Sequence, residues 1–207
     1  MLEAENLAYR YGKHRPWLFE DVSMSIEPGE IVGMTGPSGQ GKSTFAKVLA
    51  GYLPPARGEV NLGKNSLSTI GHCPVQLLFQ HPELAVNPRW KIGKILREAQ
   101  DLDPALLEDL GIQTTWLQRY PHELSGGELQ RVCLARALGP ATRYLLCDEM
   151  TSMLDALNQA HIWRIVQGIA RDRELGLLVI SHDEKLIGRL CSRVISLFDY
   201  TKHTDRK

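Results

Sequence analysis

The chain has 207 residues, enough for one α/β domain that buries about 70% of its unfolded surface, so its fold requires neither disulfides nor a structural metal. Lysine and arginine total 24 and aspartate and glutamate also total 24, and this balance offers no general attraction to nucleic acid or anionic lipid. The cysteines Cys73, Cys133, Cys147 and Cys191 include no CxxC pair, which indicates reduced thiols rather than a zinc site or a disulfide framework.

The first 26 residues differ in pattern from the rest of the chain. Short alternating strands between Leu2 and Ile26, broken from Tyr11 to Pro16, predict an antiparallel sheet that precedes the main fold. The start is acidic and no apolar core follows it, so we expect no secretion signal. No stretch approaches the ~18 uninterrupted apolar residues that a spanning helix needs. If the protein serves a membrane, we expect another chain to cross it.

Five apolar runs then alternate with helical patterns, at residues 29–36, 74–79, 144–149, 176–182 and 193–198. Continuous apolar strands between helices predict a parallel sheet that is covered on both faces. From His81 to His122 the strand pattern stops, and charged stretches such as WKIGKILREAQ and PALLEDLG predict a small helical insertion. The polar tail YTKHTDRK is expected to fray and to carry no function.

A glycine-rich loop, GPSGQGKST at 36–44, follows the first of these strands and leads into a helical pattern. It fits G-x-x-x-x-G-K-[ST], in which backbone N–H groups and the helix N-terminus bind phosphate oxygens. Lys42 is expected near the β- and γ-phosphates, and the Ser43 hydroxyl near Mg²⁺. The loop therefore predicts binding of a nucleoside triphosphate, expected to be ATP, and on its own it fits a kinase, a GTPase or a motor as well as an ATPase. The predicted nucleotide-binding residues are Gly36, Pro37, Ser38, Gly39, Gln40, Gly41, Lys42, Ser43 and Thr44.

A pair of carboxylates, Asp148 and Glu149, ends the apolar strand YLLCDE. The carboxyl ends of parallel strands meet at one sheet edge, so we expect this pair beside the phosphate loop. Asp148 would hold Mg²⁺ through water, and Glu149 would act as the base for the water that attacks the γ-phosphate.

A second glycine motif, LSGGELQR at 124–131, precedes a helical pattern whose apolar stripe contains Leu129, Val132, Cys133 and Ala137. Ser125, Gly126 and Gly127 would open a helix N-terminus that suits anions. An N-cap serine followed by glycines in a turn is the structural alternative.

In these motifs the chain resembles the ATP-binding cassette (ABC) ATPase family, with matches in order from Tyr11 to His182. The most specific is LSGGELQR, the family signature, and the loop and YLLCDE resemble its Walker A and Walker B motifs. The resemblance implies an α/β P-loop NTPase fold with a mainly parallel core sheet. It also implies one domain over 1–207, in which 1–80 and 140–207 form a RecA-like core with an N-terminal antiparallel β-subdomain, and 81–139 form a helical subdomain with the signature.

The resemblance also implies roles for residues outside those three motifs. Gln80 matches the Q-loop glutamine, which contacts Mg²⁺ and the attacking water, and His182 matches the switch histidine near the γ-phosphate. SMLD at 152–155 is similar to the D-loop through Ser152 and Asp155, with Met153 where alanine is usual. An aromatic side chain stacks on adenine in the family. Tyr11 corresponds to it, and Tyr9 is a near competitor.

Family members work in pairs, and the signature of one subunit closes over the phosphates that the other holds. Ser125, Gly126 and Gly127 would therefore complete a partner's site, and a lone copy should hydrolyse ATP slowly. The resemblance implies a second ABC ATPase subunit, identical or different, together with integral membrane permease subunits and a substrate-binding protein. It implies no nucleic acid, and it places the chain at the cytoplasmic face of the membrane.

The expected function is that of a separate ATPase subunit of an ABC transporter. The segment FQHPELAVNPRWKIGKIL at 79–96 resembles the branch that imports peptides and nickel. Members of that branch commonly continue well beyond the last strand, so we expect no added regulatory domain in a chain that stops at Lys207. The alternative is a soluble ABC ATPase that acts on ribosomes or DNA. A third class, a small P-loop kinase, is disfavoured, because such a kinase would need an arginine-rich lid and would have no LSGGE motif.

Overall fold

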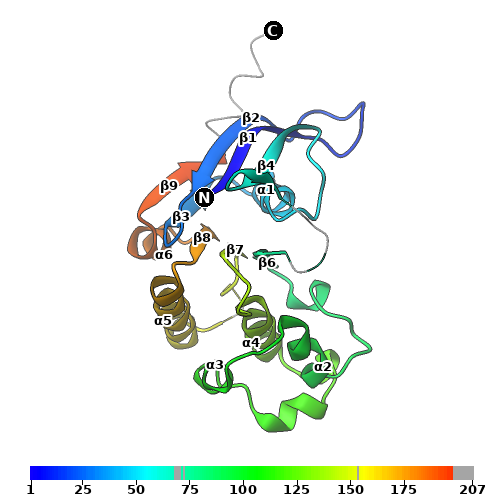
Figure 1. The fold of residues 1–207 in the computed structure, drawn as a ribbon, viewed down its shortest axis with the longest axis vertical. Coiled ribbons are helices and arrows are strands. Elements are labelled where there is room, and N and C mark those ends of the chain that lie inside the picture. The colour runs from blue at the N-terminus through cyan, green and yellow to red at the C-terminus, as the bar shows by residue number, and fades with distance from the viewer. Residues whose placement is uncertain (68–70, 72, 153, 198–207) are drawn as a thin grey trace.

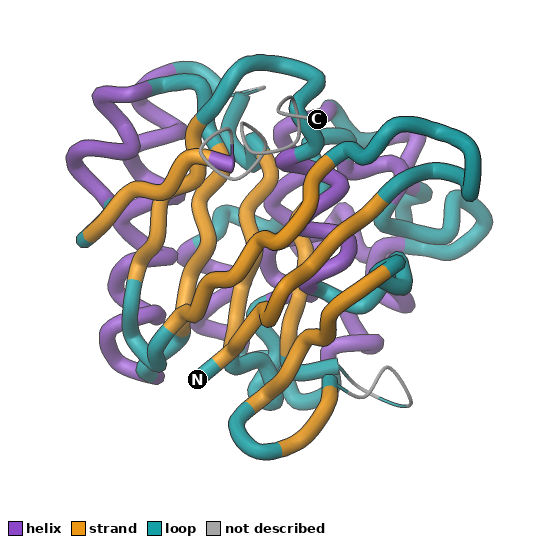
Figure 2. The backbone as a smooth tube through the Cα atoms, turned by 90° about the horizontal axis from the view of Figure 1, so that it is seen from above, coloured by secondary structure: helices purple, strands orange, loops and turns teal. Residues whose placement is uncertain are grey.

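Figure 1 shows the computed structural model, which describes residues 1–67, 71, 73–152 and 154–197. The strands lie in the upper half of this view, and α2, α3 and α4 lie below them. Figure 2, seen from above, shows the strands stacked in front of most of the helices. Met153 and the tail from 200 to 207, on which the sequence made predictions, lie outside the described residues.

A five-stranded parallel sheet forms the centre of the fold, with the strand order β6-β7-β8-β3-β9. Its strands are β3 (Ile31–Thr35), β6 (Val75–Leu78), β7 (Tyr144–Asp148), β8 (Gly176–Ile180) and β9 (Arg193–Ser196). All of their pairings are parallel. Each strand falls within one of the five predicted apolar runs, so the prediction of a parallel sheet is confirmed.

The apolar runs are continuous because both faces of this sheet are buried. On β7, Leu145 and Cys147 pack into one core while Tyr144 and Leu146 pack into the other. Alternate residues of a strand point to opposite faces, so a strand covered on both sides needs apolar residues at every position. The sheet is therefore the wall between two hydrophobic cores.

An antiparallel sheet covers one of these cores, with the order β2-β1-β4-β5. It contains β1 (Leu2–Tyr9), β2 (Phe19–Ile26), β4 (Arg57–Leu62) and β5 (Asn65–Ser66). The sequence predicted β1 and β2 but not β4 and β5. On β4, the residues Arg57, Gly58 and Glu59 are exposed and only Val60 is fully buried, so the alternation that reveals a strand is almost absent.

Three helices pack close to the parallel sheet: α1 (Lys42–Leu49), α5 (Ala156–Arg173) and α6 (Glu184–Leu190). α1 lies in the core shared with the antiparallel sheet, where the rings of Phe45 and Phe19 meet edge to face at 5.4 Å. α5 packs into the opposite core through Ile162, Trp163 and Val166. The central sheet is thus covered as the sequence predicted.

The predicted insertion, from His81 to His122, contains helices and 3-10 turns but no strand, and α4 extends this strand-free stretch to residue 137. Its elements are η1 (Pro82–Leu84), α2 (Ile92–Leu96), η2 (Arg97–Ala99), α3 (Pro104–Asp109), η3 (Thr114–Gln118), η4 (Pro121–Glu123) and α4 (Gly126–Ala137). Trp116 is 2% exposed and joins the core that α4 and α5 share. Most of these elements are too short to be stable alone, so this shared core must hold them together.

All four cysteines are free thiols, and each lies wholly or partly in the interior. Cys133 and Cys147 are buried, and Cys73 and Cys191 are half-buried. Burial raises the pKa of the Cys133 thiol to about 11 and that of Cys191 to about 11, so neither forms a reactive thiolate near neutral pH.

Within the described chain, no helix is both long enough and apolar enough to span a bilayer.

Candidate functional site

The carboxyl ends of four parallel strands bring the predicted motifs to one edge of the sheet. The phosphate loop follows β3, Gln80 follows β6, Glu149 follows β7 and His182 follows β8. Neighbouring parallel strands end at the same edge, so residues up to 146 positions apart in sequence are gathered here.

The phosphate loop turns through glycines into the N-terminus of α1. Gly41 is the N-cap of this helix and has φ 92°, a conformation that a side chain disfavours. A Cβ atom on Gly41 would lie 2.6 Å from Cγ of Leu18, which is closer than two carbon atoms approach. Glycine is therefore required at 41 both by backbone conformation and by packing against Leu18.

Lys42 is 6% exposed, and its ammonium group donates to the loop itself. Its Nζ lies 2.7 Å from the carbonyl oxygen of Gly36 and 2.9 Å from that of Pro37. Burial lowers the pKa of Lys42, while the nearby carboxylates of Glu149 and Asp148 act in the opposite direction. A partly dehydrated cation held at the mouth of a loop is well suited to pair with a phosphate oxygen.

Asp148 is 5% exposed at the end of β7, and the Ser43 side chain is hydrogen-bonded to it. Burial raises the pKa of this carboxyl group, and the Ser43 bond partly offsets that effect. A hydroxyl and a carboxylate are the hard oxygen donors that Mg²⁺ prefers, usually with waters and phosphate in its remaining positions. The chemistry of the pair Ser43 and Asp148 therefore fits a magnesium ion.

Replacing Asp148 by asparagine should stabilise the fold while removing the candidate metal ligand. A carboxyl group whose pKa is higher in the folded than in the unfolded state stabilises the fold at low pH. This stabilisation is lost as the pH rises through the pKa of the folded state. We expect Asp148→Asn to raise Tm near pH 7 by about 2–4 °C, the shift that roughly 1 kcal/mol produces in a domain of this size. Thermal melts from pH 4 to pH 7 would measure it. A Tm advantage that shrinks as the pH rises would contradict this account.

Glu149 lies between the other two predicted catalytic side chains. Its Oε2 accepts from Nε2 of Gln80 at 2.8 Å, and its Oε1 lies 2.9 Å from Nε2 of His182. Glu149 has φ 49°, which is rare for a residue with a side chain and costs on the order of 1–3 kcal/mol. Three residues chosen separately from the sequence thus form one cluster of polar contacts, with the carboxylate at its centre.

Of the two tyrosines that competed for the adenine position, only Tyr11 faces the site. Tyr11 is 68% exposed and its hydroxyl lies 2.7 Å from Oγ1 of Thr44, across the phosphate loop. Tyr9 is 9% exposed, and its ring stacks on Phe19 in the core. The geometry therefore favours Tyr11 as the aromatic surface for a base.

These groups surround one pocket of about 530 Å³. It is lined by Tyr11, Leu18, Ser38, Gly39, Gly41, Lys42, Ser43, Thr44, Gln80, Glu149 and His182. Gly36, Pro37 and Gln40 belong to the same loop but lie outside this lining, and so does Asp148, which is hydrogen-bonded to the lining residue Ser43. Leu18 is the lining residue that the sequence did not indicate, because it is one apolar residue in an irregular stretch.

The signature opens α4 at a different place on the surface. Ser125 is the N-cap: its Oγ accepts from the backbone N–H of Glu128 at 3.3 Å, and the Glu128 carboxylate accepts from the Ser125 backbone N–H at 2.8 Å. This reciprocal capping box is the structural role that the sequence left open. It leaves Ser125 and Gly126 exposed, so the N-terminus remains accessible to an anion.

The signature lines a second pocket of about 480 Å³, which shares no lining residue with the first. Ser125, Gly126 and Gly127 form one wall, and Leu154 and Asp155 contribute to another. A Cβ atom on Gly127 would lie 2.9 Å from Cδ2 of Leu154, so the glycine lets the segment before α5 approach the signature. Within one chain, the signature therefore does not reach the phosphate loop.

The predicted D-loop residues Ser152 and Asp155 differ in how far hydrogen bonds within the chain constrain their side chains. Asp155 is the N-cap of α5 and accepts from the backbone N–H groups of Leu157 and Asn158, at 3.1 and 3.0 Å. These bonds lower the pKa of the Asp155 carboxyl group. Ser152 is exposed, and its backbone N–H donates to the carbonyl of Glu149. Asp155 thus fixes the start of α5, which leaves Ser152 as the freer side chain.

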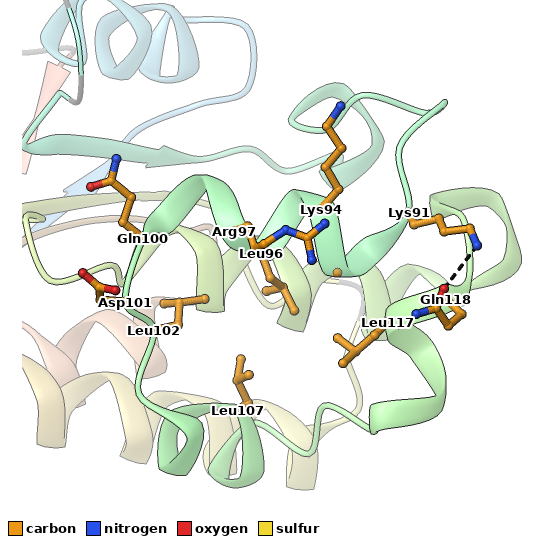
Figure 3. A pocket seen from close by; sticks show the side chains of 11 residues that line it. Lys91, Lys94, Leu96, Arg97, Gln100, Asp101, Leu102, Leu107, Leu117 and Gln118 are labelled. Atoms are coloured by element: carbon orange, nitrogen blue, oxygen red, sulfur yellow. Dashed lines mark hydrogen bonds between the residues drawn. The ribbon is translucent and has the colours of Figure 1, made fainter.

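A further pocket of about 760 Å³ lies in the helical region, away from these motifs (Figure 3). Leu107 rises from α3 toward Leu102 and Leu117 in that view. Lys94 and Arg97 lie along the opposite side, and Nζ of Lys94 is also 3.7 Å from the centre of the Trp90 ring. The pocket combines an apolar floor with a cationic rim.

Comparison with known proteins gives one family and one fold. A family described as ABC transporter matches residues 19–152. The nickel import ATP-binding protein NikE of Pseudomonas putida is 33% identical over 223 residues, covering 95% of this chain and 82% of that protein. The nickel import system ATP-binding protein NikE of Staphylococcus aureus is 34% identical over 212 residues, covering 96% and 87%.

Solved structures agree on the fold. The ATP-binding subunit of an ABC transporter superimposes with a TM-score of 0.83 at 22% identity, covering 95% of this chain and 85% of that one. The ATP-binding cassette MJ0796, solved as a dimer in a post-hydrolysis state with ADP and Pi, has a TM-score of 0.80 at 23% identity, covering 95% and 94%. The predicted fold class is confirmed by these matches.

Proposed function

The chain belongs to the ABC transporter family, and from this membership we propose that it is the ATPase subunit that powers an importer of nickel, peptide or a related small solute. The observation that carries the proposal is the pocket in which Tyr11, Lys42, Gln80, Glu149 and His182 come together. Nickel import is named for both curated relatives. It also agrees with the segment from 79 to 96, on which the sequence favoured this branch.

In the proposed mechanism, the N–H groups of the loop from Gly36 to Thr44 bind the phosphates of ATP, and Tyr11 stacks on adenine. The ammonium of Lys42 exchanges the carbonyls of the loop for oxygens of the β- and γ-phosphates. Ser43, Gln80 and Asp148 would hold Mg²⁺, which neutralises charge on the phosphates.

Glu149 would accept the proton of the water that attacks the γ-phosphate. Gln80 and His182 hold its two carboxylate oxygens and so fix the direction in which the base points. Because the signature lines a separate pocket, we propose that Ser125, Gly126 and Gly127 act on the ATP of a second subunit. Ser152 and Asp155 are proposed to contribute to nucleotide binding as well. Two bound ATP molecules would then join the subunits, and hydrolysis would let them separate.

We further propose that the chain works at the cytoplasmic face of the membrane, with a like ATPase subunit, permease subunits and a substrate-binding protein. The division into a core (1–80 and 140–207) and a helical subdomain (81–139) is part of this proposal. The leucine-floored pocket of Figure 3 lies in that subdomain and offers a concave, cationic surface to a permease segment. The relatives reported above give no support to the alternative of a ribosomal or DNA-associated ATPase.

A charge reversal at the rim of this pocket tests the membrane partner. We expect the chain, expressed with its genomic neighbours, to copurify with integral membrane proteins, and Lys94→Glu to weaken that association about tenfold. Lys64→Glu, on the exposed turn between β4 and β5, is the matched control and should not change it. Copurification with ribosomes instead would support the alternative, and equal recovery of both variants would remove this pocket from the interface.

A further inference from the structure

Helix α5 is anchored to the loop after β7 through one buried hydroxyl group. Thr151 is 4% exposed, and its Oγ1 accepts from Nε2 of Gln159 at 2.8 Å and from Nε1 of Trp163 at 3.2 Å. Gln159 and Trp163 are four residues apart on α5, so their side chains lie on the same face of the helix. A buried acceptor that receives two donors from one helix fixes the loop relative to that helix.

The loop that is held in this way contains the strained residue of the site. Glu149 has φ 49°, and its carbonyl accepts from the N–H of Ser152 at 3.0 Å. The carbonyl of Thr151 accepts from the N–H of Leu154 at 3.1 Å. A strained backbone conformation persists only where surrounding contacts determine it, and Thr151 is two residues from Glu149.

The anchor, by which we mean the contact between Thr151, Gln159 and Trp163, adjoins the catalytic cluster in one small cavity. Its volume is about 210 Å³, and Glu149 and His182 line it together with Thr151, Gln159 and Trp163. Thr151 and Glu149 are thus connected both by the backbone of the loop and by this shared cavity, neither of which involves the phosphate loop.

We propose that Gln159 and Trp163 are positioning residues for ATP hydrolysis: through the hydroxyl of Thr151 they hold the loop in the conformation that places the Glu149 carboxylate between Gln80 and His182. The proposal rests on the function proposed above, in which Glu149 is the base. Neither Gln159 nor Trp163 lines the pocket of the phosphate loop. Their effect is therefore on turnover and not on ATP binding.

Thr151→Val tests the proposal, because it replaces the hydroxyl with a methyl group of nearly the same volume. We expect kcat to fall roughly 10- to 100-fold, as for small misplacements of a catalytic group, while KM for ATP stays within about twofold. Thr151→Ser keeps the acceptor and should restore most of kcat. Wild-type kcat in Thr151→Val would overturn the proposal. An equal loss in Thr151→Ser would also overturn it, since that result indicates packing rather than hydrogen bonding.

Gln159→Met provides a second test if Thr151→Val does not fold, because it removes one donor from a half-buried helix position and keeps the length of the side chain. It should lower kcat several-fold at unchanged KM, and wild-type kcat would count against the anchor. Glu149→Gln, measured in parallel, separates the two claims. If Glu149→Gln hydrolyses ATP normally, the proposed base is wrong. If Glu149→Gln is inactive while Gln159→Met and Thr151→Val have wild-type kcat, only the anchor is wrong.

Discussion

Glu149→Gln is expected to lower ATP turnover by about 10²–10⁴-fold, the usual contribution of a general base, and to leave ATP affinity within about twofold. The amide has the shape of the carboxylate and can still meet Gln80 and His182, but it cannot accept the proton of the attacking water. Steady-state phosphate release and fluorescent-nucleotide titration would measure the two quantities separately.

The same variant should accumulate as an ATP-bound dimer, because the bridging γ-phosphates are not removed. Size-exclusion chromatography with Mg²⁺ and ATP would show the dimer. Glu108→Gln, at an exposed position on α3 far from the motifs, is the matched control and should behave as the wild type. Wild-type turnover in Glu149→Gln would contradict the assignment of the base.

Ser125→Arg should reduce turnover by at least about 10²-fold while the isolated subunit binds ATP normally. The arginine would fill the exposed N-terminus of α4, where we propose that the partner's γ-phosphate is bound. The phosphate loop of the same chain lies in a separate pocket, so its affinity should not change.

The loss of the helix cap must be separated from this effect, since Ser125 closes the capping box with Glu128. Removing an N-cap serine costs about 1 kcal/mol of stability. Ser125→Ala removes the cap without adding bulk, and it should lower Tm by a few degrees yet lose much less activity than Ser125→Arg. If Ser125→Arg loses ATP binding in the isolated subunit, the role of Ser125 is in folding.

The parallel sheet could be predicted because burial on both faces leaves a continuous apolar run, as on β7. β4 could not, because it buries little more than Val60. The order of the motifs along the chain predicted which residues would meet, but it contained no information on packing. Only the fold shows that Tyr9 is in the core while Tyr11 faces the pocket.

The same limit applies to contacts made by ordinary residues. Leu18 has no motif around it, and it lines the pocket because β1 and β2 bring it against Gly41. Gln159 and Trp163 read as one polar and one apolar residue of a helix, and their common acceptor is visible only in three dimensions. Sequence patterns reveal residues with unusual chemistry better than residues that hold them in place.

The central claim is that each ATP site is completed by another subunit, and mixing two inactive variants tests it most directly. Lys42→Ala disables the phosphate loop and Ser125→Arg disables the signature, and the two purified variants are mixed in equal amounts. A mixed dimer contains one intact loop facing one intact signature, so the mixture should regain roughly a quarter of wild-type turnover per subunit. A mixture that stays as inactive as either variant alone would contradict the claim.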